Sequence, residues 1–107
     1  MNNARRKRIK EAIRMLNEGF KLNDYDAIDY GRDIISDVLD DEQYSYDNIP
    51  ESLQYSDRAE RSYEAIELLE ESYSMIEWLT ETEFKNKDNI NIKDAINNVI
   101  CNLNKIL

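Results

Sequence analysis

The chain has 107 residues, of which 41% are hydrophobic and 35% are charged, and its formal net charge is −9. This composition predicts a single domain, residues 1–107, with a modest core under a densely charged surface. The acidic balance argues against direct binding to nucleic acid, and the lack of histidine argues against an enzyme or a metal site. We expect no bound cofactor.

The first segment, from Met1 to Leu22, predicts a helix capped by Asn2 or Asn3. Its apolar residues recur at intervals of four, three and four, which places them on one helix face: Ile9, Ile13, Leu16 and Phe20. The start of this helix carries only positive charges, at Arg5, Arg6, Lys7, Arg8 and Lys10. This basic segment either contacts nucleic acid or an acidic partner, or lies against the protein's own acidic surface or in solvent. We favour the second interpretation, because a nucleic-acid-binding arm normally belongs to a basic fold.

Residues 23–46 predict a second helix, with Asn23 or Asp24 as its N-cap. Its apolar side consists of Ile28, Ile35, Val38 and Leu39. Gly31 costs about 1 kcal/mol relative to alanine in a helix interior, so it marks either a bend or a close contact. The pattern leaves open whether the first two segments form separate helices or one long, kinked helix.

Five aspartates lie along one face of this second helix, at intervals of three, four, four and three; we call them the acidic row: Asp26, Asp29, Asp33, Asp37 and Asp40. Neighbouring Cβ atoms at this spacing are about 5–6 Å apart, and like charges so placed destabilise a helix. The row is either an ordinary solvated face or a surface that meets a basic groove, with carboxylates in place of phosphates. Residues 24–83 hold nineteen acidic and three basic residues, a formal charge of −16, which favours the second interpretation.

Two tyrosines follow the acidic row directly, and tyrosine is enriched at protein interfaces. We therefore predict a partner-binding surface that extends the acidic row by Asp41, Glu42, Tyr44 and Tyr46. In the alternative interpretation, the tyrosine rings pack on the helices and leave only their hydroxyls in water.

Pro50 starts a short connector helix over Glu51 to Gln54, with Ile49 and Leu53 as its expected anchors to the core. Ser56 or Asp57 caps a third helix, predicted from Arg58 to about Phe84. Its apolar residues repeat at four and three without a break: Ala59, Tyr63, Ile66, Leu69, Tyr73, Ile76 and Leu79. Glutamates lie opposite this seam, and Trp78 lies off it.

A polar turn, Lys85 to Asn89, precedes a last helix predicted from Ile92 to Leu107. Cys101 lies off the apolar stripe of that helix, and no histidine is present to activate its thiol. A single cysteine fits a reducing compartment, no apolar run is long enough to span a membrane, and the basic start lacks the apolar segment of a signal peptide. We therefore expect a cytoplasmic protein.

Four stretches carry a resemblance: ARRKRIKEA (residues 4–12), DIISDVLDDEQ (33–43), DNIPESLQYSDR (47–58) and EAIELLEE (64–71), of which DNIPESLQ is the most specific. In these the chain resembles small, acidic, helical proteins of bacteriophages and prophages of Gram-positive bacteria. It departs from them over residues 18–31 and from residue 84 onward. The resemblance implies a phage setting rather than an activity. In that setting, small acidic proteins often inhibit host defence nucleases, including CRISPR effectors, by occupying their nucleic-acid grooves.

We expect an all-α antiparallel bundle of three long helices and a short connector helix near Pro50, or of four helices if the chain breaks at residues 19–24. The first functional hypothesis is a phage-encoded protein that inhibits a basic, nucleic-acid-binding host defence protein, such as a nuclease. The second is a structural or assembly protein that forms a homodimer or larger homo-oligomer. The third is a small nucleic-acid-associated regulator that uses the basic segment.

Overall fold

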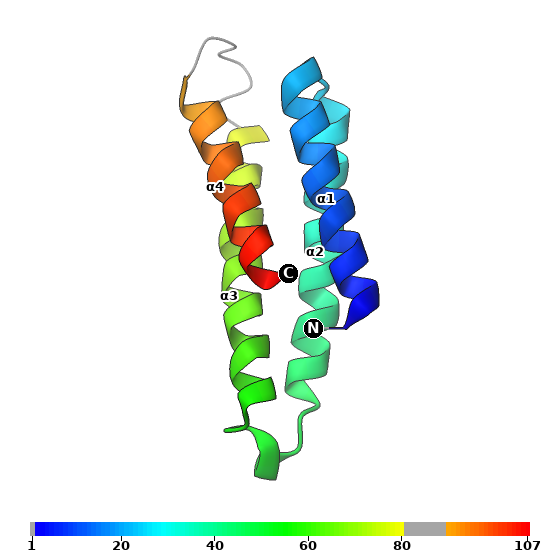
Figure 1. Cartoon of the computed structure of the whole chain (residues 1–107), viewed down its shortest axis with the longest axis vertical. Coiled ribbons are helices and arrows are strands. Elements are labelled where there is room, and N and C mark those ends of the chain that lie inside the picture. The colour runs from blue at the N-terminus through cyan, green and yellow to red at the C-terminus, as the bar shows by residue number, and fades with distance from the viewer. Residues whose placement is uncertain (1, 81–89) are drawn as a thin grey trace.

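The computed structural model describes residues 2–80 and 90–107, with side chains from residue 93 onward in the second range. This part of the chain forms the predicted all-α bundle (Figure 1). Its elements are α1 (Asn3–Leu22), α2 (Tyr25–Asp47), the short 3-10 helix η1 (Glu51–Leu53), α3 (Asp57–Trp78) and α4 (Ile90–Ile106). Neighbouring helices run antiparallel, and α1 also packs against α4, so that the four helices form an elongated bundle with overall dimensions of 51 × 21 × 18 Å.

Polar residues cap the helices where the sequence predicts breaks. The Oδ1 atom of Asn2 accepts a hydrogen bond from the Arg5 amide at 2.8 Å, and Asp24 and Ser56 cap α2 and α3 in the same way. Between α1 and α2, Asn23 adopts the left-handed conformation, with φ of 53°, which asparagine tolerates better than most residues. The chain therefore turns at Asn23, and of the two arrangements left open by the sequence, the four-helix one is confirmed.

Two glycines allow α1 and α2 to approach closely. A Cβ atom at Gly31 would lie 3.1 Å from Cδ2 of Leu16, and one at Gly19 would lie 2.7 Å from Cγ1 of Ile28. The conformation of both glycines is ordinary for a helix, so the requirement here is for space. Of the two roles expected for Gly31, a bend or a close contact, the structure shows the close contact.

The core consists of aliphatic side chains from all four helices, including Ile9, Leu16, Ile28, Ile35, Val38, Leu69, Ile76, Val99 and Leu103. The predicted seam of the third helix is correct at Ala59 and wrong at Tyr63, whose side chain is 50% exposed. Ser62, not Tyr63, is buried in the core at this turn of the helix. Adjacent side chains differ in direction by about 100° around a helix, so Tyr63 points away from the core. Leu53 is also exposed, so the expected anchor of the connector helix at this position is wrong.

Parts of two sequence predictions fall outside the described residues: the end of the third helix beyond residue 80, and the polar turn over residues 85–89. The helix bounds that are described agree with the prediction to within a few residues. For example, α4 starts at Ile90 rather than Ile92. Among the described residues, none of the helices combines the length and the apolar character that crossing a membrane requires.

Candidate protein-binding surface

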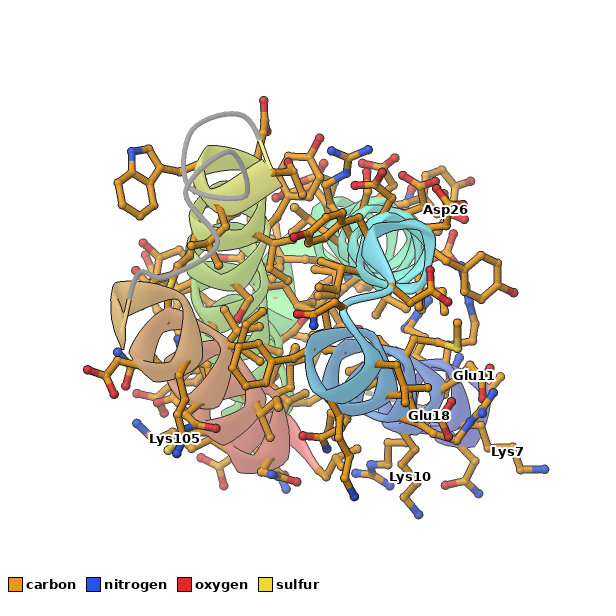
Figure 2. All side chains as sticks on the ribbon, turned by 90° about the horizontal axis from the view of Figure 1, so that it is seen from above. Lys7, Lys10, Glu11, Glu18, Asp26 and Lys105 are labelled. Carbon is orange, nitrogen blue, oxygen red and sulfur yellow. The ribbon has the colours of Figure 1, made fainter. Side chains whose placement is uncertain are left out.

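The acidic row lies on the outer face of α2, opposite the residues that α2 buries. Asp26, Asp33, Asp37 and Asp40 are exposed, and Asp29 is half-buried. From Asp26 to Asp40 the row extends for about 21 Å, at a rise of about 1.5 Å per residue. Seen along the bundle, the Asp26 side chain points away from the helices into solvent (Figure 2). The row therefore presents its carboxylates outward, as a partner-binding surface would require.

Two arginines neutralise part of this row. Arg32 lies between Asp29 and Asp33, with nitrogen–oxygen distances of 3.8 and 3.7 Å. Arg8 of α1 lies 3.7 Å from Asp37 and forms a close ion pair with Asp41. Such exposed pairs contribute roughly 0–1 kcal/mol each, so they restrain the carboxylates only weakly.

The two remaining members of the row, Asp26 and Asp40, form no ion pair with the described residues. The row thus faces both the basic segment and the solvent. Asp37 is bridged to Arg8 of α1, while Asp26, at the start of α2, and Asp40 are exposed and form no ion pair with the described residues.

Glu42 belongs to a different environment, and its assignment to the partner-binding surface is wrong. Its side chain is 2% exposed and lies between α1 and α3. Its Oε2 atom lies 3.2 Å from a guanidinium nitrogen of Arg5, and its Oε1 atom accepts a hydrogen bond of 2.8 Å from the Ser62 hydroxyl. Arg5 also donates to the Ser45 hydroxyl. Both oxygens of this carboxylate are therefore engaged within the bundle, and it is not part of the exposed acidic surface.

The two tyrosines predicted as anchors have different surroundings. Tyr44 is 73% exposed, which suits a contact with a partner. Tyr46 is half-buried, and its ring packs against that of Tyr63, with centroids 6.0 Å apart. A hydrogen bond to Glu67 and its negative charge raise the pKa of Tyr63 above its ordinary value. Tyr46 thus forms part of an aromatic contact between α2 and α3.

The basic segment is divided between internal and external roles. Arg5 and Arg8 form ion pairs with α2, as the interpretation that we favoured requires. Arg6, Lys7 and Lys10 are exposed and form no ion pair with the described residues. Lys7 and Lys10 point away from the bundle, on a different side from Asp26 (Figure 2).

A second line of carboxylates, which we call the α3 row, was not predicted as a site. It follows the exposed face of α3 at intervals of three, four, three and four: Asp57, Glu60, Glu64, Glu67 and Glu71. All five are exposed, and none forms an ion pair with the described residues. The spacing is visible in the sequence, but Glu64, Glu67 and Glu71 had been assigned only to the solvent face opposite the apolar seam, and Asp57 only to a possible N-cap.

Within the described residues, no group of three or more acidic or cysteine side chains is placed to hold a metal ion. The Cys101 thiol is exposed on α4. No protein-family model, no curated protein and no solved structure matches the chain.

Proposed function

We propose that the protein binds a basic, nucleic-acid-binding protein through the outer faces of α2 and α3 and so excludes nucleic acid from it. The observation that carries this proposal is the pair of acidic rows on two helices that pack against each other. Together they offer ten carboxylates, of which only the three nearest Arg8 and Arg32 have a described cation within 4 Å.

The shared sign and linear order of these charges support a groove built for nucleic acid as the partner surface, although they are more widely spaced than phosphates. The acidic row carries one carboxylate per about 5 Å of helix axis, whereas one strand of DNA carries one phosphate per about 3.4 Å. Repulsion at these intervals destabilises both helices and is offset only in part, by Arg8 and Arg32, so the stability of the fold does not account for the rows. Opposite a surface rich in lysine and arginine, the same repulsion is relieved and association is accelerated.

The class of partner follows from the resemblance to phage and prophage proteins noted above. In that setting we propose a host defence nuclease as the target, with Tyr44 as an exposed aromatic anchor beside the carboxylates. The involvement of Arg5 and Arg8 in internal ion pairs weighs against the alternative in which the basic segment binds nucleic acid.

A structural homo-oligomer remains the second candidate, because one largely apolar hollow opens between α3 and α4, bordered by Glu71 at the end of the α3 row. Met75, Trp78 and Ala95 line this hollow of about 510 Å³ between α3 and α4. Trp78 is 49% exposed there, so a second copy covering it would bury a large aromatic surface. Sedimentation over a range of protein concentrations distinguishes this candidate from a monomeric inhibitor.

The test is capture of a partner from a Gram-positive host lysate at low and high salt, followed by competition with nucleic acid. The captured protein is purified, and its binding to labelled nucleic acid is measured with increasing amounts of the inhibitor. We expect displacement by the wild-type protein and weaker displacement at high salt. Asp33→Asn/Asp40→Asn on α2 and Glu60→Gln/Glu71→Gln on α3 should each reduce it.

The matched control is Glu51→Gln/Asp94→Asn, which removes two exposed carboxylates outside both rows. It should leave displacement unchanged. If the control and the row variants lose displacement equally, displacement depends on the net charge of the protein and not on the two rows. Capture of a partner that still binds nucleic acid in the presence of the inhibitor would refute the proposed mechanism.

A further inference from the structure

A cleft of about 420 Å³ lies where the start of α1, the end of α2 and the start of α3 meet. Four arginines line it, two from α1 and two from α3: Arg5, Arg6, Arg58 and Arg61. Glu42 forms part of its inner wall. Four guanidinium groups and one carboxylate leave a formal charge of +3, in a chain whose net charge is −9.

Most of this positive charge is uncompensated. Arg5 is held by Glu42 and Ser45, and it forms a fixed part of the wall. Arg6 donates to Asn3 at 3.4 Å, and Arg61 donates to the backbone carbonyl of Asp57 at 3.3 Å; neither contact neutralises charge. Arg58 forms no hydrogen bond or ion pair with the described residues, so three guanidinium groups retain free donors.

The helix ends increase the positive potential. Arg5 and Arg6 lie near the start of α1 and Arg58 in the first turn of α3, where the helix dipoles are positive and cations are disfavoured. The first turn of α1 lacks an acidic residue that would offset this, whereas the first turn of α3 contains Asp57 and Glu60. At the start of α1 the arrangement therefore opposes folding stability, and an anion bound in the cleft would relieve it.

The basic surface continues beyond the cleft. A smaller hollow of about 130 Å³ is lined again by Arg6 and Arg61, together with Lys105 near the end of α4. Glu64 of the α3 row borders it. A ligand with two linked anionic groups could therefore contact the cleft with one group and the neighbouring hollow with the other.

We propose that this cleft binds a small phosphorylated molecule through Arg6, Arg58 and Arg61, with a diphosphate group as the element that is recognised. Guanidinium groups bind phosphate oxygens through paired hydrogen bonds, and arginine is the preferred residue for such contacts. The volume lies in the range of ordinary small-molecule sites, roughly 300–1,000 Å³. The surrounding carboxylates repel a long polyanion, which favours a small ligand over a nucleic-acid strand.

Isothermal titration calorimetry with inorganic pyrophosphate, and separately with adenosine diphosphate, tests this proposal at constant ionic strength. We expect saturable binding of one ligand per chain. Arg58→Gln/Arg61→Gln should weaken it at least tenfold, because charge-assisted hydrogen bonds are lost. Both arginines are exposed, so this variant should fold, and thermal unfolding checks that it does.

Lys7→Gln/Lys10→Gln is the control, because it removes two exposed positive charges of α1 outside the cleft. It should change the affinity less than twofold. Amide chemical-shift changes should concentrate at Ser45 and Ser62, which line the cleft. No saturable binding at millimolar ligand, equal losses in both variants, or binding of oligonucleotides alone would overturn the proposal. None of the residues that line this cleft belongs to the acidic rows, so its test is independent of the inhibitor proposal.

Discussion

The buried carboxylate of Glu42 makes the most demanding prediction about stability. Glu42→Ala leaves the guanidinium group of Arg5, which is 16% exposed, without its counter-charge, and leaves the Ser62 hydroxyl without its acceptor. Removing one partner of a buried ion pair typically costs 3–5 kcal/mol. Because Arg5 keeps its hydrogen bond to Ser45 and some solvent contact, we expect a loss of about 3 kcal/mol in the free energy of unfolding.

Urea unfolding followed by circular dichroism measures this loss directly, and thermal unfolding gives a second estimate. For a domain of this size, about 3 kcal/mol corresponds to a decrease in Tm of roughly 12–24 °C. Glu42→Gln keeps the volume and an acceptor for Ser62 but removes the charge, so its loss should be intermediate. Ser62→Ala should cost about 1 kcal/mol, since one carboxylate oxygen remains buried without that donor.

The neighbouring residue provides the control. Asp41→Ala also removes a carboxylate from α2 that pairs with an arginine of α1, but both partners are exposed. Its effect should stay within about 0.5 kcal/mol. If Glu42→Ala is no more destabilising than Asp41→Ala, the Glu42 carboxylate does not hold α1, α2 and α3 together as described.

Three further predictions follow from local geometry. Gly19→Ala should destabilise the protein by about 1–3 kcal/mol, because the added Cβ would lie 2.9 Å from a backbone oxygen. Gly31→Ala should cost less, since only the side chain of Leu16 must move. Urea unfolding of both variants compares the two losses. Ser56→Ala should cost about 1 kcal/mol through loss of the α3 N-cap, and an unchanged urea midpoint would contradict this. In the folded protein the pKa of Tyr63 is higher than in the unfolded chain, so folding favours the neutral phenol. The stability that this shift contributes is complete below about pH 10 and is lost as the pH rises through the raised pKa. Glu67→Gln should return that pKa toward its ordinary value in an NMR titration of the Tyr63 ring, and an unchanged titration would exclude Glu67 as the cause.

The sequence predicted the helices well because their signals are local. Apolar periodicity, the capping residues Asn2, Asp24 and Ser56, and the break before α2 are all contained in short windows. Periodicity failed where the core admits small polar residues. Ser62 and Ser72 are buried, and a pattern based on apolar side chains selected Tyr63 instead.

The environment of Glu42 could not be predicted, because it depends on residues distant in the sequence. Glu42 follows two exposed aspartates and resembles them in the sequence, yet its partners lie 37 residues earlier and 20 residues later. The arginines of the basic cleft are separated in the same way: two lie near the start of the chain and two at the start of α3. Only the packing of α1 beside α2 and α3 brings these groups together.

The order in which the helices pack has a kinetic consequence. Each helix contacts the one that precedes it in the chain, so most of the bundle can form from successive hairpins between sequence neighbours. Proteins with such local contacts fold in microseconds to milliseconds, because little loop-closure entropy is lost before contacts form. The contact between α1 and α4 is the exception, since even the nearest ends of these helices, Leu22 and Ile90, are about seventy residues apart in the chain. We therefore expect α4 to dock late, onto a preformed assembly of α1, α2 and α3.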